Sequence, residues 1–216
     1  MRSQASKLGR RINVLPEQPY NPLDKKNLGV SVADALLDRV PVPLPPASFV
    51  GAGVYAIYYT GAFPEYAAIA SSNRQSRFLQ PIYVGRAVPP GRRKGGFSSD
   101  AGPGRVLASR LKKHASSIEV AKNLKLEDFW CRFLVVDDIW IPLGESLLID
   151  RFSPIWNKVV EGFGNNDPGK NRYNQARSPW DTIHPGRPWA EAMQPNPMKS
   201  EEILDQILAK TSTSAG

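Results

Sequence analysis

The pattern of apolar and polar residues predicts three β-strands in the middle of the chain. An aromatic and β-branched run, VGAGVYAIYYT, covers residues 50–60, and PIYVG follows at 81–85. FWCRFLVVDD at 129–138 is the third run of this kind. Turn residues between the first two runs favour an antiparallel pair. Because side chains alternate along a strand, the first run offers two faces, one with Tyr55, Ile57 and Tyr59 and the other with Val54, Ala56 and Tyr58.

Helical spacing predicts a helix over residues 104–117, and one stripe of this helix carries unusual residues. Leu107, Arg110, Leu111 and His114 recur at i, i+3, i+4 and i+7, so Arg110 and His114 lie on the apolar side. Two explanations fit this placement. The two side chains either reach past the edge of the stripe to water, or form an anion-binding site at the edge of the sheet.

A second helix begins at Pro142 and ends before Ser153-Pro154. Glu145 heads its apolar stripe, which continues through Leu148, Ile149 and Phe152. This carboxylate is either a first-turn acid stabilised by the helix dipole or a buried group with a partner. Near an arginine and a basic loop, the second interpretation suggests a Mg²⁺ ligand, since Mg²⁺ takes one or two protein carboxylates beside phosphate and water.

These elements give the central order β-β-α-β-α and an α+β fold, with a small three-stranded antiparallel sheet flanked by helices. Residues 49–160 form the expected core, with a Gly/Pro/Arg-rich loop inserted at 86–104. Residues 1–48 are rich in proline and have one helical pattern at 30–40, which indicates an arm or wrap. Residues 161–216 form a loop-rich C-terminal extension with a terminal helix at 200–210.

Charge favours nucleic acid as the partner. The chain has 216 residues and a formal net charge of +8. Eight basic residues and one acidic residue lie between Arg86 and His114, so most of the excess falls in one stretch. The single cysteine, Cys131, excludes an intramolecular disulfide and an all-cysteine zinc site, and its apolar neighbours predict a buried, inert thiol. With no run of about 20 apolar residues and no secretory signal, we expect a cytoplasmic protein without a membrane partner.

Four short motifs, taken in order, resemble those of the GIY-YIG nuclease superfamily. GVY at 53–55 and YVG at 83–85 lie on consecutive strands, RLKKH at 110–114 matches an Arg-x-x-x-His helix, and ESLLIDRFSPIWN at 145–157 joins a glutamate to an asparagine. Valine replaces isoleucine in both tripeptides, and the segment between the second tripeptide and the helix is longer than in minimal members. The short chain with extensions on both flanks is most similar to the type II restriction endonucleases of this superfamily, including one that recognises CCGCGG.

The resemblance implies a mechanism and assigns roles in it. Glu145 would hold one Mg²⁺ against the scissile phosphate, and Arg110 would neutralise charge on that phosphate. Tyr55 would accept a proton from the attacking water or position it, and Tyr83 and His114 would order water and phosphate. Asn157 would brace the site. Double-stranded DNA is the implied substrate, and cutting both strands of a palindrome implies a homodimer. A restriction enzyme also implies a cognate methyltransferase.

Basic residues outside the motifs are candidate DNA contacts, either with phosphates or with guanine edges in the major groove. His184 in TIHPGRPW is expected to anchor a turn. The candidate contacts are Arg86, Arg92, Arg93, Lys94, Arg105, Lys113, Arg172, Arg177 and Arg187.

Two other functions remain open at this point. The first is a homing or repair nuclease of the same fold, although 216 residues leave little room for a separate DNA-binding domain. The second is a non-catalytic nucleic-acid-binding protein, in which Tyr58 or Tyr59 would stack on bases from the surface of the sheet.

Overall fold

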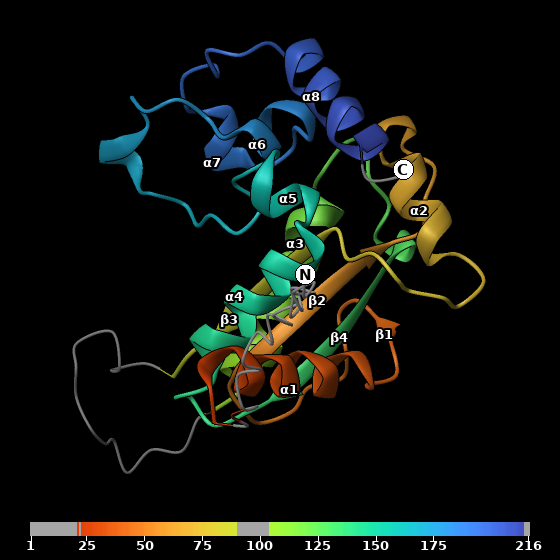
Figure 1. Ribbon diagram of the computed structural model, residues 1–216. Helices are drawn as coiled ribbons and strands as arrows, with labels where there is room; N and C mark the ends of the chain where they lie inside the picture. Colours follow the sequence, from red (N-terminus) through yellow and green to blue (C-terminus); the bar gives the residue numbers. More distant parts are fainter. Residues whose placement is uncertain (1–20, 22, 90–103, 214–216) are drawn as a thin grey trace, which may run out of the picture.

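The computed structural model describes residues 21, 23–89 and 104–213. Three of the expected DNA contacts, Arg92, Arg93 and Lys94, lie outside the described residues and stay predictions. Figure 1 shows a central sheet, with helix α1 (Lys25–Leu37) at one end of the molecule and helix α8 (Ser200–Thr213) at the other.

The sheet is antiparallel, as predicted, but it has four strands. Their order is β1-β4-β2-β3, with β1 at Val42–Pro43, β2 at Gly53–Tyr59, β3 at Tyr83–Ala87 and β4 at Phe129–Val135. The three predicted strands are confirmed. The additional strand β1 has two residues and pairs with β4 at the sheet edge. Proline is tolerated there because an edge strand does not have to donate hydrogen bonds on both sides. The sequence did not predict this strand, because two residues in a proline-rich segment show no alternation of apolar and polar positions.

The two helices that carry the motifs are confirmed as α3 (Val106–Glu119) and α4 (Ile141–Phe152). Helix α1 begins before the predicted segment because Asp24 caps it, accepting a hydrogen bond from the backbone nitrogen of Lys26. Helix α2 has no counterpart in the prediction. The other helices are α2 (Ala67–Asn73), α5 (Ile155–Lys158), α6 (Pro179–Ile183) and α7 (Pro188–Glu191), with 3-10 turns at Pro64–Tyr66, Leu126–Asp128 and Lys170–Arg172.

Strand β2 is buried along its whole length, and each of its faces belongs to a different core. Tyr55, Ile57 and Tyr59 pack with α3 and with the segment that follows α4. The opposite face packs against α1 and α4. Helix α1 and strand β1 therefore belong to the layers of the folded core, whereas the sequence suggested a wrap around it.

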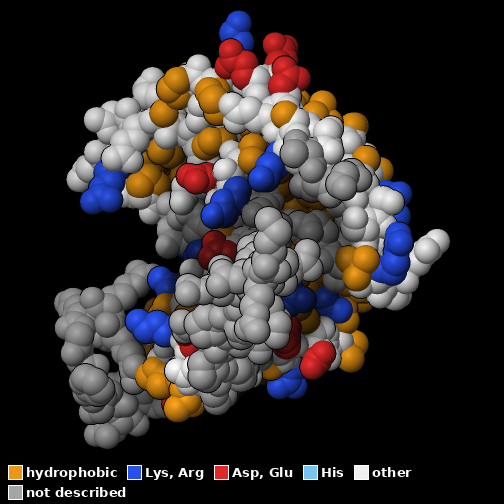
Figure 2. Space-filling view, in the orientation of Figure 1, with side chains coloured by type: hydrophobic (Ala, Val, Ile, Leu, Met, Phe, Trp, Pro, Cys, Tyr) orange, Lys and Arg blue, Asp and Glu red, His pale blue; other side chains and the backbone are white. Residues whose placement is uncertain are grey.

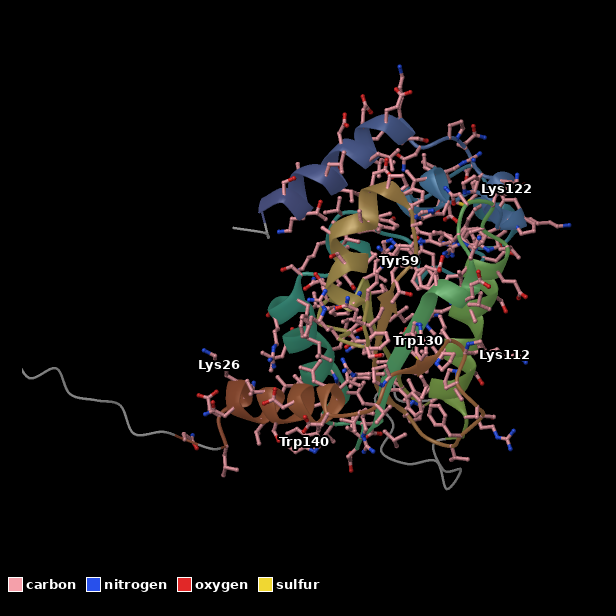
Figure 3. All side chains as sticks on the ribbon, turned by 90° about the vertical axis from the view of Figure 1, so that its right-hand side faces the viewer. Lys26, Tyr59, Lys112, Lys122, Trp130 and Trp140 are labelled. Carbon is pink, nitrogen blue, oxygen red and sulfur yellow. The ribbon has the colours of Figure 1, made fainter. Side chains whose placement is uncertain are left out.

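Burial of the β2 tyrosines removes the basis for an aromatic stacking surface. Tyr58 is 0% exposed and Tyr59 is 2% exposed, so neither ring can stack on a base. Figure 3 shows Tyr59 inside the molecule, while Lys112 of α3 points outward. Cys131 is buried, and burial raises the pKa of its thiol to about 12, which agrees with an inert role. Within the described ranges, no helix is long and apolar enough to cross a bilayer.

A buried polar chain ties the sheet side of the molecule to the C-terminal segment. Trp156 Nε1 donates to the Tyr66 hydroxyl at 2.8 Å, and this hydroxyl lies 2.8 Å from His184 Nε2. Asn123 Oδ1 lies 3.0 Å from the other ring nitrogen of His184. His184 is fully buried and anchors the turn, as expected from the sequence. Burial, assisted by Arg187, lowers its pKa to about 3.

This pKa predicts an acid-sensitive fold. Between about pH 3 and 6.5 the unfolded chain binds a proton at position 184 that the folded chain does not, so the free energy of unfolding falls as the pH is lowered through this range. From pH 7 to pH 5 we expect His184 to account for a loss of about 2 kcal/mol, measured by urea unfolding. The variant His184→Gln should lose that part of the pH slope; an unchanged slope would contradict the assignment.

Candidate active site

A tyrosine of β2 and a histidine of α3 form the centre of the site. The Tyr55 hydroxyl lies 2.6 Å from His114 Nε2, and both side chains are buried. Tyr83 of β3 joins them, with its ring centroid 6.2 Å from that of Tyr55 and 5.3 Å from that of His114. Phe163 stacks on the imidazole at 4.5 Å. Residues from three elements and a later segment therefore meet at one place.

The glycine of the second tripeptide makes this packing possible. Gly85 lies opposite Tyr55 in the ladder between β2 and β3. A Cβ atom at this position would lie 2.6 Å from Tyr55 Cζ, too close for the Tyr55 ring to keep its place, and in tight contact with Tyr83 Cε1 at 3.0 Å. The Tyr-x-Gly spacing thus follows from the need to pack two tyrosine rings across one strand.

Arg110 lies one helical turn before His114, beside both phenols. Its Nη2 donates to the carbonyl of Gly164 at 2.7 Å, and its Nη1 donates to Asn166 Oδ1 at 3.4 Å. Gly164 is also close to Tyr83, since a Cβ there would lie 2.6 Å from the Tyr83 hydroxyl. The chain after residue 160 therefore helps to build the site, whereas the sequence predicted a core that ends at this residue.

Glu145 reaches the site from the other face of the sheet. Its Oε2 lies 3.0 Å from Nε of Arg86, and the two side chains are 22% and 43% exposed. Arg86 follows Gly85 and so points to the opposite face of β3 from Tyr83. The charge of Glu145 nevertheless acts on Tyr55 and Tyr83, so the site extends around the edge strand β3. Arg86 was expected as a DNA contact, and its pairing with this carboxylate was not foreseen.

Asn157 of α5 completes the exposed edge of β3. Its Oδ1 accepts from the backbone nitrogen of Val84 at 2.8 Å, and its Nδ2 donates to the carbonyl of the same residue at 2.9 Å. The amide thus takes the place of a neighbouring strand for the residue between Tyr83 and Gly85. An edge strand fixed on both sides holds its side chains in one register.

Burial sets the protonation of the central pair. It raises the pKa of Tyr55 well above the ordinary value, further helped by Tyr83 and opposed by Arg110. It lowers the pKa of His114 well below the ordinary value, and the positive charges of Arg110 and Arg187 act in the same direction. Both groups are therefore neutral near pH 7. Burial also raises the pKa of Glu145, opposed by Arg86 and Arg110.

The remaining candidate DNA contacts occupy different environments. Arg105, Lys113 and Arg172 are exposed, and Arg177 is half-buried. Arg187 is 4% exposed and forms an ion pair with the buried Asp181 at 2.7 Å. The expectation that Arg187 contacts DNA is corrected, because a buried guanidinium paired with a carboxylate cannot reach a phosphate or a base.

Comparison with known families settles the broad assignment. Residues 47–211, well over half of the chain, match the family model described as the Eco29kI GIY-YIG domain. The chain belongs to this family. Among curated proteins, no relative matches it. The family consists of restriction-type GIY-YIG nucleases, which act on DNA. The match continues to residue 211, which agrees with the contribution of residues after 160 to the folded site.

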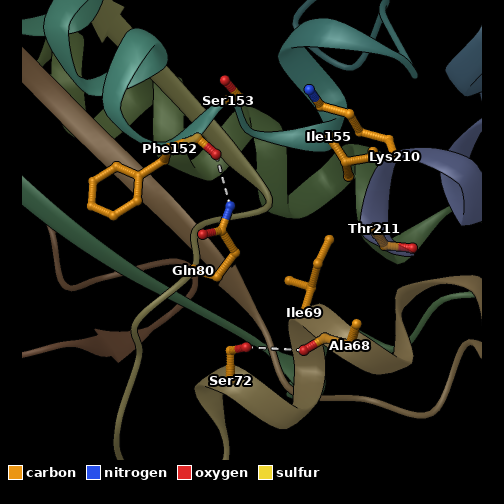
Figure 4. Close-up of a pocket in the computed structure, with 9 residues that line it drawn as sticks. All are labelled: Ala68, Ile69, Ser72, Gln80, Phe152, Ser153, Ile155, Lys210 and Thr211. Carbon is orange, nitrogen blue, oxygen red and sulfur yellow. Dashed lines mark hydrogen bonds between the residues drawn. The ribbon is translucent and has the colours of Figure 1, made fainter. Parts of the chain in front are cut away.

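The cavity in Figure 4 is lined by residues other than those of the candidate site. It measures about 220 Å³ and is formed by α2, α8 and the link after α4, where Gln80 Nε2 donates to the carbonyl of Phe152 at 2.8 Å. Ile69 and Ser153 also line it. None of its lining residues is a candidate site residue.

In this Eco29kI GIY-YIG domain, a metal ion bound by the described residues would need phosphate oxygens and water as additional ligands. Over residues 23–89 and 104–213, no group of three His, Cys, Asp or Glu side chains could hold an ion by itself. Glu145 offers one half-buried carboxylate beside two arginines that would attract a phosphate. One carboxylate supplemented by phosphate oxygens and water is a common way to bind Mg²⁺, so the residues present fit such an ion.

The hydrogen bonds of Asn157 predict a specific loss on truncation. Asn157→Ala leaves the outer edge of β3 unpaired, so we expect unfolding stability to fall by about 1–3 kcal/mol and DNA cleavage to fall more than tenfold. Asn73→Ala is a matched control, because Asn73 also bonds backbone groups but is the last residue of α2. It should lose similar stability in urea and keep its cleavage rate. Equal loss of cleavage in both variants would contradict a role of Asn157 in the site.

Proposed function

We propose that this chain is a type II restriction endonuclease that hydrolyses phosphodiester bonds of double-stranded DNA at a short palindromic site. The observation that carries the proposal is the meeting of Tyr55, Tyr83, Arg110 and His114 with Glu145 around the edge strand β3. These side chains come from four separate segments of the sequence. Packing alone gives no reason to gather two phenols, a guanidinium, an imidazole and a carboxylate there.

Arg110 is the group that neutralises the scissile phosphate. Its guanidinium is half-buried and held by the Gly164 carbonyl, so it is oriented before DNA arrives. A fixed cation in a partly water-excluded site stabilises the extra negative charge that develops on phosphorus oxygens during hydrolysis. Arg86, on the other side of β3, supplies a second cation near the same phosphate.

Tyr55 and His114 are buried in the free protein, and they would act together on an attacking water that reaches the phenol oxygen when DNA binds. A buried phenol with a raised pKa is not a phenolate near pH 7, so Tyr55 alone is a poor base. The neutral imidazole at 2.6 Å can accept the hydroxyl proton while the phenol oxygen receives one from water. The negative charge of a bound phosphate would raise the pKa of His114 and favour this transfer. Tyr83, beside both rings, orients the water and the phosphate.

Glu145 would hold one Mg²⁺ together with phosphate oxygens and water. Such an ion stabilises charge on the phosphate and on the leaving oxygen. In the free protein the same carboxylate pairs with Arg86, so ion binding and the release of this arginine toward DNA would accompany each other.

The proposed target is GC-rich, and CCGCGG is the sequence suggested by the resemblance of the whole chain. Cutting both strands of a palindrome calls for two copies of the site related by a two-fold axis, so the working enzyme is proposed to be a homodimer. A cognate methyltransferase would protect the host DNA.

Removal of the proposed metal ligand tests the assignment. Purified protein incubated with plasmid DNA and Mg²⁺ should give discrete fragments, and chelation by EDTA should stop cleavage. Glu145→Ala should abolish cleavage, a loss of at least about a thousandfold, while a gel-shift assay still detects DNA binding. Asp150→Ala, on the exposed side of the same helix, is the control and should cut normally.

Three other outcomes of this assay would argue against the proposal. Full cleavage by Glu145→Ala would remove the metal-ligand role. Nicks, or cuts that depend on DNA structure, would favour a repair nuclease. Intact DNA with a gel shift would favour a non-catalytic binding protein.

Coupling between Tyr55 and His114 is tested by a double variant. Tyr55→Phe and His114→Asn should each lower the single-turnover cleavage rate by about 10²–10⁴. Because the two groups move one proton together, the double variant should be about as slow as either single variant. Tyr58→Phe, which removes a buried hydroxyl from the opposite face of the same strand, should retain the rate. Multiplication of the two single effects would contradict the shared step.

A further inference from the structure

We propose that residues 165–175 form a base-reading loop that contacts the edges of DNA base pairs beside the scissile phosphate. This inference rests on the proposed function and assigns sequence recognition to a defined element. The loop has the sequence NNDPGKNRYNQ and joins the nuclease site to α6. In Figure 1 it projects from the C-terminal part of the molecule, away from the sheet.

Composition is the first argument. The loop contains four asparagines, a glutamine, a lysine and an arginine within eleven residues. Arginine and lysine pair with guanine, which suits the GC-rich target proposed above, and the amide side chains carry both donors and acceptors for other base edges. These seven side chains are all exposed, and they are Asn165, Asn166, Lys170, Asn171, Arg172, Asn174 and Gln175.

A phosphate-binding loop explains this composition less well. Neutral amides add little to the attraction of phosphates, which depends on charge. A loop built only for electrostatic attraction would carry more lysine and arginine in place of asparagine. Asp167, the acidic residue of the loop, is used internally, so the outward charges are those of Lys170 and Arg172.

Position is the second argument. The first residue before the loop, Gly164, accepts a hydrogen bond from Arg110 at 2.7 Å, and Asn166 Oδ1 lies 3.4 Å from the same guanidinium. Arg110 is the proposed binding group for the scissile phosphate. One end of the loop therefore lies at the point of cleavage. Figure 2 shows a hollow in the surface below this projecting lobe, with Lys and Arg side chains at its edges.

Internal bonds hold the loop in a fixed shape. Asp167 accepts from the backbone nitrogen of Gly169 at 2.8 Å and from the Tyr173 hydroxyl at 3.1 Å. At the far end, Gln194 bonds the backbone of Gln175 and Arg177. A preorganised loop loses less conformational entropy on binding, which suits direct reading of bases.

The buried Arg187 anchors the near end of the loop. Its guanidinium donates to the carbonyls of Gly162 at 3.1 Å and Asn165 at 3.3 Å, and Asp181 holds it in place. An arginine first expected at the DNA thus serves as a positioning residue for the segment that carries both the Arg110 acceptor and the base-reading side chains.

The test compares sequence preference before and after truncation of the loop side chains. Full-length protein is used to select duplexes from a randomised pool in the presence of Ca²⁺, and the bound sequences are determined. Cleavage of the preferred duplex and of each single-base-pair variant is then measured with Mg²⁺. The variants are Asn171→Ala, Arg172→Ala and Asn174→Ala, with Arg77→Ala, an exposed arginine after α2, as the charge control.

We expect at least one loop variant to lose about 10- to 100-fold in discrimination at a defined base-pair position, in both selection and cleavage. The control should keep wild-type preference. Equal weakening on all sequences with a smaller salt dependence would identify phosphate contacts only and overturn the inference, as would an unchanged preference in all three variants.

The selection step separates the two proposals. If the wild-type protein binds a preferred sequence but does not cut it, the nuclease proposal fails while the loop inference is still decided by the variants. If the protein cuts and the loop variants keep full discrimination, the loop inference fails alone. Thermal melting of each variant checks that the exposed substitutions leave the fold intact.

Discussion

The site depends on the hydrogen bond between Tyr55 and His114, which forms where Tyr55 lies opposite Gly85 in the sheet. A 2.6 Å hydrogen bond between two fully buried groups requires β2 and α3 to keep a fixed distance. It also requires that β3 carry no side chain opposite the phenol. In a low-dielectric interior, breaking this bond would leave two polar groups unpaired, so the packing and the polar contact stabilise each other.

Much of the core was predictable because local periodicity and tertiary burial agree there. Alternation in β2 gave the two faces that the two cores bury, and the helical stripe of α3 placed Arg110 and His114 beside the sheet. The pairing of Arg86 with Glu145 was not predictable, since it depends on how α4 crosses the edge strand and no sequence spacing encodes that crossing. Strand β1 was missed for a similar reason, as two residues of a proline-rich segment carry no period.

The C-terminal segment was the least predictable part, although it completes the site. Its short helices and loops have no long hydrophobic period, and its contacts are made largely by aromatic rings and backbone carbonyls. Phe163 stacks on His114, and Gly164 offers its carbonyl to Arg110. The signal that could have suggested a structural role is the close spacing of Trp180, Asp181, His184 and Arg187, a set of bulky and polar residues that a surface extension does not need.

The charges around the site favour the binding of a polyanion. Arg110 and Arg86 face one half-buried carboxylate, and the buried tyrosine and histidine are neutral, so the immediate surroundings carry an excess of positive charge. Such an excess of positive charge attracts a phosphate. A phosphate bound beside Arg110 would raise the proton affinity of His114, because Arg110 is one of the charges that lower it. The protonation of this buried imidazole therefore depends on whether an anion lies beside it.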